Sequence, residues 1–421
     1  MTIVHLNTHS YGGAAVVARR LHLAALAAGI DSQLITEYGL SGDDTAQYTA
    51  LRDARLRYAL RERAAHPAMY RLGKFVQKRL QHRNLANRPP GYEIFSPLNS
   101  LARFVDCIEP FDPNVIHLHW VAGFVDHADF FMRNRHRRFV WTLHDMNPFT
   151  GGCHHADGCM SFITGCPHCP QLQGTIDPTY AGEVFQGKAA ALAPLEDHQL
   201  VITAPSRWLL GLSQQSPITA RFRHVHIANP SLDAGGSAID MDETRRALQL
   251  PIDKKIVLFV SDNLRNPRKG VQMLFAAADR MRRKREIQLV GIGHRTDIPR
   301  GLDVKFTGRV TNDSVLRAYF SCADVLVNPS MMENSPLTVI EALSCGTPAI
   351  AFAVGGVAEL INDGSGVVIP ERHADALAEA LDHVLFGRTY DRAAIRCGMA
   401  EHQPRAVLEK FKDLYMEQPK A

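Results

Sequence analysis

The chain has 421 residues, of which 46% are hydrophobic and 21% are charged. This balance is typical of soluble globular proteins and excludes general disorder and a membrane-embedded body. The length exceeds what one core comfortably supports, so it predicts two domains of roughly 200 residues each. No apolar run approaches the ~18 residues that a membrane-spanning helix needs.

The first residues, MTIVHLN, lack the basic-then-apolar layout of a secretory signal, so we expect a cytoplasmic protein. In a reducing compartment the eight cysteines are expected to be thiols or metal ligands rather than disulfides.

Net charge is only +4, but one segment is strongly basic. Between Leu51 and Arg103, twelve Lys or Arg stand against three acidic residues, a local net charge of +9. Within it, AMYRLGKFVQKRL places apolar side chains on one helical face with basic ones around them. This layout is typical of a helix lying on an anionic membrane surface, and the alternative is a packed helix with a basic solvated face.

Short apolar runs alternate with stretches of helical period, which predicts parallel sheets covered by helices. The first half has runs at Ile3–Leu6, Gln33–Thr36, Val115–Leu118, Phe139–Leu143 and Val201–Ala204. The second half has runs at Ile256–Val260, Gln288–Ile292, Lys305–Thr307, Val325–Asn328 and Ala349–Ala353. We therefore expect two doubly wound α/β domains that bind ligands at the carboxyl ends of their strands, with a cleft between the domains.

The segment NPSLDAGGSAID, residues 229–240, is the best linker candidate. We expect an acceptor-side domain over 1–228, with a basic helical insert near 51–103 and a Cys-rich loop at 151–170. A ligand-binding domain would cover 229–395, and a helical tail 396–421.

The most informative stretch is PSMMENSPLTVIEALSCGTPAIAF, after the run Val325–Asn328. Ser335 is expected to cap a helix with Pro336 at its first position, which leaves the N–H groups of Leu337 and Thr338 free to bind phosphate. Glu333 and Glu341 would flank that site and accept hydrogen bonds from sugar hydroxyls. The alternative is a capped helix with two solvated glutamates.

The run Ile256–Val260 leads into SDNLRNPRKG, which places Arg265, Arg268 and Lys269 at a strand end. Basic groups there would neutralise a diphosphate and the charge that develops as it leaves. A charged turn is the alternative. A further strand-to-helix glycine turn stands at Gly355–Val357.

Two features of the first half could reach the same cleft. THSYGGAAVVARRL joins a strand to a helix through Gly12 and Gly13, which allow a ligand to approach the backbone closely. FVWTLHDMNPF delivers His144 and Asp145 from a strand end, where the histidine is either structural or functional.

Taken together, these motifs resemble the family-4 retaining glycosyltransferases of the GT-B fold. The resemblance covers nearly the whole chain: the GG turn, T-x-H-D, a strand followed by RKG, and two glutamates with seven residues between them, followed by CGTPAIA and GG. The segment His119–Phe124 with WTLHDMNPFTGGCHH looks like a bacterial subgroup of exopolysaccharide, capsule or lipopolysaccharide assembly.

The resemblance implies roles for individual residues. Glu341 would bind the ribose, and Glu333 would lie by the transferred sugar, whose hydroxyls also meet the backbone of Asn334, Ser335, Pro336 and Leu337. The diphosphate would be held by Lys269 with Arg268 or Arg265, and approached by Gly12 and Gly13. Val310 would border the nucleobase and His144 would contact the donor sugar. Asn263 stands where the family usually has an arginine, a departure for which Arg265 would substitute.

The resemblance also implies the reaction. A sugar would pass from a nucleotide sugar, UDP- or GDP-linked, to a saccharide or lipid-linked saccharide acceptor with retention of configuration. Front-side attack would need no carboxylate pair of the glycosidase kind and no catalytic cofactor. Other candidates are an epimerase or hydrolase of the same fold, and a zinc-dependent binding module. Nucleic acid is not an expected partner, because no aromatic residues interleave with the basic ones.

Residues 151–170 read GGCHHADGCMSFITGCPHCP. Cys153, Cys159, Cys166 and Cys169 suit a structural zinc, although only the last pair has the close spacing common in zinc sites. His154, His155 and His168 are possible substitutes, and a set of buried thiols is the alternative. The loop would brace the acceptor-side wall.

Overall fold

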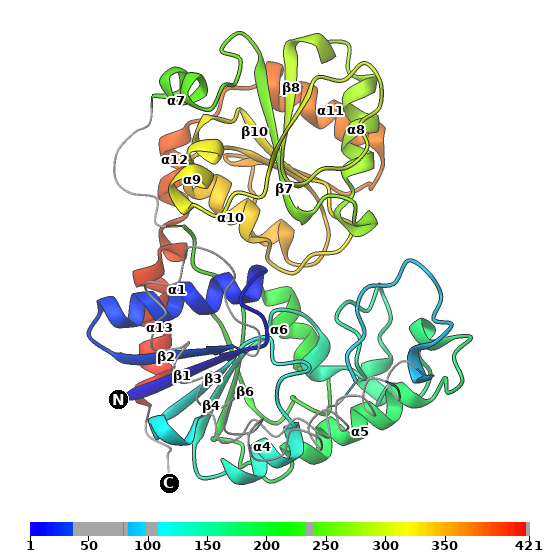
Figure 1. The fold of residues 1–421 in the computed structure, drawn as a ribbon, viewed down its shortest axis with the longest axis vertical. Coiled ribbons are helices and arrows are strands. Elements are labelled where there is room, and N and C mark those ends of the chain that lie inside the picture. The colour runs from blue at the N-terminus through cyan, green and yellow to red at the C-terminus, as the bar shows by residue number, and fades with distance from the viewer. Residues whose placement is uncertain (37–78, 80–82, 98–107, 233–239, 418–421) are drawn as a thin grey trace. The chain divides into compact units, whose positions relative to one another are not determined.

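A computed structural model describes residues 1–36, 79, 83–97, 108–232 and 240–417. It divides into two compact units (Figure 1). The first comprises Met1–Ile227 with Leu408–Ala421, and the second comprises Ala228–Val407. The basic helix predicted near residues 69–80, with most of the basic insert, lies outside the described residues.

The sheet of the first unit has six parallel strands in the order β2-β1-β3-β4-β5-β6. They are β1 (Thr2–Asn7), β2 (Asp31–Thr36), β3 (Val115–Leu118), β4 (Arg138–Thr142), β5 (Leu200–Ala204) and β6 (Arg223–His226). Strands β3 and β5 are buried along their whole length, as expected where helices cover both faces. The described helices before residue 228 are α1 (Gly13–Ala27), α4 (His127–Arg133), α5 (Tyr180–Leu192) and α6 (Arg207–Ser213).

The sheet of the second unit also has six parallel strands, in the order β12-β11-β10-β7-β8-β9. They are β7 (Lys255–Asn263), β8 (Ile287–His294), β9 (Val304–Gly308), β10 (Val325–Asn328), β11 (Ala349–Phe352) and β12 (Gly366–Ile369). Its helices are α7 (Met241–Ala247), α8 (Val271–Arg280), α9 (Asp313–Cys322), α10 (Leu337–Ser344), α11 (Ala374–Asp382) and α12 (Arg392–Gly398). A π-helical turn, His383–Gly387, continues α11.

The ten predicted strands are all present, and the described residues form two further strands that were not predicted. Both β6 and β12 lie at a sheet edge. The sequence of β6, RHVH, has three polar residues in four and is only partly buried, so it lacks the apolar run on which the prediction depended.

The helix α13 (Pro404–Met416) begins in the second unit, and its residues from Leu408 onward belong to the first. Phe411 and Tyr415 are buried there, and Tyr415 Oη lies 2.7 Å from His117 Nδ1 on β3. Arg138, the first residue of β4, donates to the carbonyl of Leu414 at 2.8 Å. The C-terminal segment is thus part of the first unit's core.

Each sheet has one point at which the strand order reverses. In the first unit this point lies between β1 and β3, and in the second between β7 and β10. Doubly wound sheets bind ligands in the crevice outside the strand ends at such points. The residues that follow these four strands are therefore where the sites should be sought.

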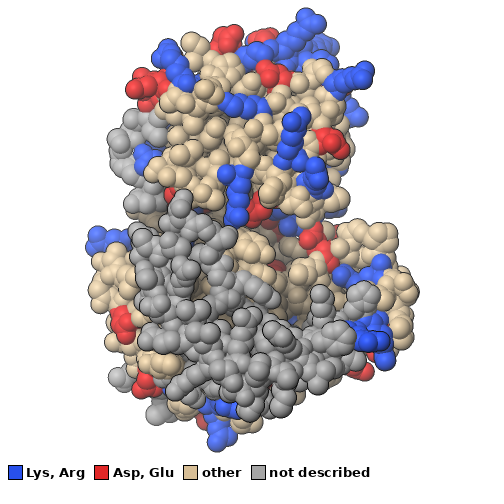
Figure 2. Space-filling model, in the orientation of Figure 1, with Lys and Arg blue, Asp and Glu red and all other residues tan. Residues whose placement is uncertain are grey.

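Two surface properties complete the fold. In the described part of the chain no helix is long and apolar enough to cross a membrane. Figure 2 shows lysines and arginines spread over the visible face of the second unit, with acidic side chains among them.

Candidate functional site

In the second unit, the turn after β7 packs directly against the loop after β10. The amide of Met331 donates to the carbonyl of Arg268 at 2.7 Å. Gly270 has a φ of 65°, and a Cβ there would lie 1.9 Å from the carbonyl oxygen of Pro329. Only glycine satisfies both the left-handed conformation and this close approach, which explains the RKG turn and holds Arg268 and Lys269 at the reversal point.

The two loops are joined by an ion pair at this edge. Lys269 Nζ lies 2.6 Å from Glu333 Oε1, and Arg268 NH1 lies 3.6 Å from the same oxygen. Burial alone would raise the pKa of Glu333, but the cationic Lys269 and Arg268 outweigh it and lower that pKa. Glu333 is therefore an ionised acceptor at neutral pH, and its cationic partners could bind an anion instead.

Arg268 has a second anchor, because its NH1 donates to the carbonyl of Met332 at 2.7 Å. Lys269 has a side chain that is 26% exposed, compared with 14% for Arg268. Of these two cations, Lys269 is the more accessible to a ligand.

The start of α10 differs from the prediction in one respect. Ser335 was expected to cap the helix, but the N-cap position is Pro336, with no side-chain cap hydrogen bond. The first described helical bonds run from Val339 and Ile340 to the Pro336 carbonyl, so Leu337 and Thr338 occupy the first turn, as predicted for an anion site.

The hydroxyl of Ser335 is buried and has no hydrogen-bond partner among the described residues. Buried polar atoms normally have a partner, so this hydroxyl is a candidate to bond a ligand. Asn229 Nδ2 donates to the Ser335 carbonyl at 3.2 Å, which fixes the backbone while leaving the hydroxyl available.

The remaining predicted residues near α10 lie in the same unit. Glu341 is 5% exposed, one turn into the helix. The carbonyl of Asn334 accepts from the amide of Gly356 at 3.0 Å, which ties the predicted glycine turn at residues 355–357 to this loop. Thr338 Oγ1 accepts from Asn328 Nδ2 at 3.3 Å, from the last residue of β10.

Three predicted residues have no described hydrogen bond or ion pair to Lys269 or Glu333. They are Asn263, Arg265 and Val310. Asn263 ends β7, and its side chain caps the local turn by accepting from the Arg265 amide at 3.0 Å. Arg265 is exposed and donates from Nε to the carbonyl of Arg295 at 3.1 Å, beyond the end of β8. Val310 follows β9, and β8 lies between that strand and β7.

In the first unit, the segments after β1 and β3 are bonded to each other at the reversal point. The amide of Trp120 donates to Asn7 Oδ1 at 2.9 Å, and the amide of Thr8 donates to the Trp120 carbonyl at 2.7 Å. Gly12 is the N-cap of α1 with a φ of 87°, and a Cβ there would meet no atom within 4 Å. Glycine is needed at this position for its backbone angle, and the space beside it is open.

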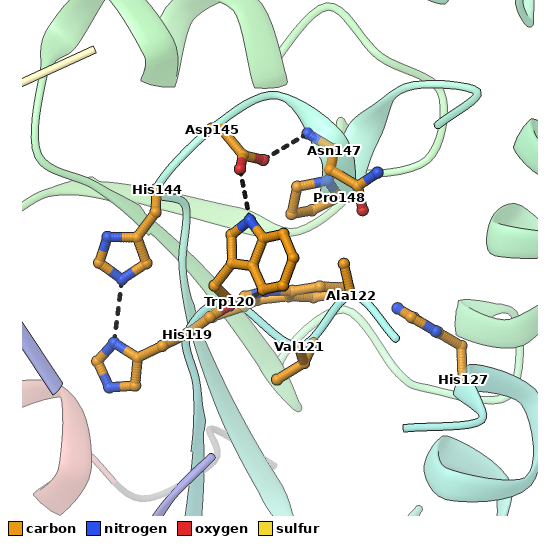
Figure 3. Close-up of a pocket in the computed structure, with 10 residues that line it drawn as sticks. His119, Trp120, Val121, Ala122, His127, His144, Asp145, Asn147 and Pro148 are labelled. Atoms are coloured by element: carbon orange, nitrogen blue, oxygen red, sulfur yellow. Dashed lines mark hydrogen bonds between the residues drawn. The ribbon is translucent and has the colours of Figure 1, made fainter. Parts of the chain in front are cut away.

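His144 and Asp145 follow β4 and line a recess (Figure 3). The other lining residues are 119–122, His127, Trp141, Asn147 and Pro148. Asp145 Oδ2 accepts from Trp120 Nε1 at 2.7 Å and lies 2.6 Å from His154 Nδ1. Burial would raise the pKa of Asp145, but His154 and the Asn147 amide outweigh it and lower that pKa to about 2. Burial lowers the pKa of His144 to about 4, so this imidazole is neutral at physiological pH.

The structure also reveals functional candidates that the sequence reasoning missed. One candidate is a buried cluster of three histidines, His5, His117 and His119. Each ring offers a nitrogen as a possible metal ligand, and these nitrogens all lie within 4.8 Å of one another. The alternating pattern of IHLHW was the available signal, because residues two apart in a strand share a face.

The Cys-rich loop does not form such a group in the described chain, and its cysteines are free thiols. Burial raises the pKa of Cys153 to about 12 and that of Cys166 to about 11. His154, considered as a substitute ligand, instead lies between Asp145 and Ser96, with Nε2 2.8 Å from Ser96 Oγ. The zinc site stays a prediction.

Lys188 on α5 holds the start of this loop from inside. It is 3% exposed, and its Nζ donates to the carbonyls of Asn147 and, at 3.0 Å, Thr150. Burial lowers its pKa to about 8. Lys188 thus holds the start of the loop against α5.

Comparison with solved structures identifies the architecture. HepE from Anabaena, solved with UDP-glucose, aligns over 98% of this chain and 99% of its own, with a TM-score of 0.61 and 16% identity. Sucrose-phosphate synthase from Thermosynechococcus elongatus aligns over 98% of both chains, with a TM-score of 0.58 and 20% identity. Two parallel six-stranded sheets with flanking helices, matching these proteins, define the GT-B fold of glycosyltransferases.

Sequence comparison defines the family. Residues 254–386 match the family described as glycosyl transferases group 1. The putative colanic acid biosynthesis glycosyl transferase WcaC of Escherichia coli K12 is 26% identical, over 99% of both chains. The D-inositol 3-phosphate glycosyltransferase of Mycobacterium tuberculosis is 31% identical over 41% of both chains. Residues 254–386 of the second unit therefore match the group 1 glycosyl transferases, and the chain as a whole has the GT-B fold.

Proposed function

We propose that this glycosyltransferase moves a sugar from a nucleoside diphosphate sugar to a saccharide acceptor and retains the configuration of the anomeric carbon. The observation that carries the proposal is the Lys269–Glu333 pair at the β7–β10 reversal point. A cation, an ionised acceptor and the first turn of a helix stand there in one loop cluster. This is the chemistry that a sugar joined to a diphosphate requires.

Donor binding would exchange partners within this cluster. The diphosphate would take Lys269 from Glu333, assisted by the N–H groups at the start of α10. Glu333 would then accept hydrogen bonds from the transferred sugar, while Arg268 stays anchored on the Met332 carbonyl. Glu341, which lies one turn into α10, would bind the ribose, so the proposed donor site extends along this helix.

The chemical step would depend on charge stabilisation. As the glycosidic bond breaks, negative charge grows on the leaving diphosphate, and Lys269 with Arg268 would stabilise it. The same phosphate oxygen would accept the proton of the attacking hydroxyl on the same face of the sugar. Retention and membership of family 4 rest on the sequence resemblance, which also assigns Gly12 and Gly13 to the diphosphate and His144 to the donor sugar.

The relatives support a donor class and a pathway class. HepE has been solved with UDP-glucose, which favours UDP ahead of GDP for this chain. WcaC is described as acting in colanic acid biosynthesis, which favours bacterial polysaccharide or glycolipid assembly.

A thermal-shift panel of UDP-, GDP- and ADP-sugars tests the donor. We expect one nucleotide series to raise the melting temperature of the wild type and to lose that effect in Lys269→Ala. The matched control is Lys254→Ala, because Lys254 pairs with Asp303 at 2.7 Å just before β7 begins, at the opposite end of that strand. An equal shift in wild type and Lys269→Ala would contradict the proposed diphosphate site.

Product analysis separates transfer from its alternatives. With donor and a lipid-linked saccharide, a transferase forms a longer glycan whose new linkage keeps the donor's anomeric configuration. A hydrolase releases free sugar, and an epimerase returns an altered nucleotide sugar without acceptor. A product whose new linkage has the inverted anomeric configuration would contradict the retaining mechanism but not the transfer reaction.

We also propose peripheral association with the cytoplasmic face of the membrane, on the basis of the basic segment in residues 51–103. Sedimentation with vesicles of anionic and of zwitterionic lipid tests it. Equal binding to the anionic and the zwitterionic vesicles would contradict an electrostatic contribution to membrane association.

A further inference from the structure

Three imidazoles form a hydrogen-bonded series that ends at His144. His5 Nδ1 lies 3.1 Å from His119 Nε2, and His119 Nδ1 lies 3.1 Å from His144 Nε2. Figure 3 shows the second of these contacts, between the ring of His119 and that of His144. His119 uses a different nitrogen for each of its two neighbours, so the tautomers of the three rings depend on one another.

The sheet places this series in the interior of the first unit. His5 pairs with His117 across β1 and β3, and His119 follows two residues later on the same face. His5 and His119 are each 1% exposed. Water therefore has little access to these rings, and their hydrogen bonds must be made with one another.

A metal ion is the first alternative, because the ring nitrogens of His5, His117 and His119 lie within 4.8 Å. The rings, however, are stacked: His117 and His119 have centroids 4.3 Å apart with planes inclined at 24°. Stacked rings direct their in-plane lone pairs past one another rather than at one ion.

His117 also has both nitrogens occupied. Its Nδ1 lies 2.7 Å from Tyr415 Oη, and its Nε2 lies 2.7 Å from Thr142 Oγ1. A metal would have to break both bonds, so the contacts favour a hydrogen-bonded series over a metal centre.

The series has two possible directions. If His144 donates from Nε2, then His119 donates from Nε2 to His5, and the proton of His5 must lie on Nε2. That atom is buried without a hydrogen-bond partner among the described residues. A buried N–H donor without a partner is rare, whereas an acceptor without one is more often tolerated. The reverse direction, in which His5 and His119 both donate from Nδ1, leaves only a lone pair at that atom.

We propose that His5 and His119 are positioning residues that hold His144 in the Nδ1–H tautomer. His144 Nε2 is then occupied as an acceptor, and the single proton of the neutral ring lies on Nδ1. In the proposed function, a sugar hydroxyl or phosphate oxygen of the donor would accept a hydrogen bond from this Nδ1–H. This use of His144 rests on the proposed function, whereas the tautomer itself does not.

Nuclear magnetic resonance of ¹⁵N-histidine-labelled protein tests the tautomer directly. The His144 signals are assigned by their loss in His144→Gln. In the wild type we expect His144 Nδ1 in the protonated range and Nε2 in the lone-pair range, with the same pattern for His119. A protonated Nε2 on His144 overturns the proposal.

Two substitutions at His5 test the coupling. His5→Leu removes the terminal donor, so the His144 Nε2 signal should move toward the protonated range as the second tautomer becomes populated. His5→Asn keeps an N–H donor near the position of Nδ1 and should restore the wild-type signals. His117→Asn is the matched control, since it changes an equally buried ring on the same face outside the series.

An unchanged His144 signal in His5→Leu, or an equal change in His117→Asn, overturns the positioning role. Shifts of the His5, His117 and His119 signals on addition of stoichiometric Zn²⁺ also overturn it, in favour of a metal site. If the tautomer is as expected but a bound nucleotide sugar leaves the His144 signals unmoved, the proposed donor contact fails while the positioning role stands.

Discussion

The buried histidines should make the first unit sensitive to acid. Burial lowers the pKa of His5 and His127 from 6.5 to about 3, and that of His22 to about 4. In the unfolded chain these rings titrate near 6.5. A base whose pKa is lowered by folding contributes its full stability above the unfolded pKa and loses it as the pH falls.

The magnitude follows from proton linkage. At pH 5 each of these rings is almost fully protonated in the unfolded chain and almost fully neutral in the folded one. One proton is worth about 1.36 kcal/mol per pH unit, so moving 1.5 units below pKa 6.5 costs about 2 kcal/mol per ring. Three rings together remove about 6 kcal/mol, which is comparable to the whole stability of many domains.

Urea unfolding followed by tryptophan fluorescence measures this effect, because the three tryptophans, Trp120, Trp141 and Trp208, all lie in the first unit. The variant His127→Leu removes one titrating ring from a site packed against Phe131 and Trp141. Near pH 5 the slope of unfolding free energy against pH should fall by about 1.3 kcal/mol per unit.

The control is His136→Leu, at an exposed histidine of the same unit, where burial cannot act. Comparison of variants cancels the contribution of carboxylates, which titrate in the same range. An identical slope in wild type and His127→Leu would refute the reasoning, as would an equal loss of slope in the control.

Three further predictions concern single contacts. Lys269→Ala should lower kcat by about 10²-fold or more in a donor-consumption assay, by analogy with loss of an oxyanion donor, and full turnover would sink the assigned role. Gly270→Ala should destabilise the second unit by several kcal/mol in circular-dichroism melts, because its Cβ meets the Pro329 carbonyl. Gly301 has a φ of 89° but open space around it, so Gly301→Ala should lower the free energy of unfolding by only about 1 kcal/mol. Equal losses in the two variants would contradict the predicted clash at Gly270. Lys188→Met should cost about 2 kcal/mol in the fluorescence assay by leaving two buried carbonyls unpaired, and a wild-type midpoint would disprove this.

Much of the second unit could be predicted because the sequence patterns that indicate its turns and helix starts are local. The turn residues of PRKG and the proline-led start of α10 follow from backbone preferences of single residues. Even here the N-cap was wrong by one position, because cap assignment depends on the dihedral angles of Pro336 rather than on which residue has a hydroxyl. Arg268 or Arg265 was expected at the diphosphate with Lys269, and this stays a prediction. The bond of Arg265 to the Arg295 carbonyl could not be predicted, because it depends on β8, which is remote in sequence.

The histidine series shows the converse limit. His5 lies more than a hundred residues from His119, and their contact exists only because β1 and β3 are neighbours in the sheet. Strand order is not encoded in any one strand. The pattern IHLHW could have indicated two histidines on one face, but not which residue lies opposite them.

The sequence by itself determined two α/β domains, ten of the twelve strands seen in the described ranges, and the segments that carry the candidate chemistry, because apolar period and turn chemistry act over a few residues. Only the tertiary structure decided that Lys269 pairs with Glu333, that His154 bonds Asp145, and that the C-terminal helix completes the first unit's core. His154 and Asp145 are only nine residues apart, and their bond depends on the path of the loop between them. The Lys269–Glu333 pair and the contacts of the C-terminal helix join residues far apart in the chain, and they depend on strand order and close packing. Local sequence preferences do not specify either.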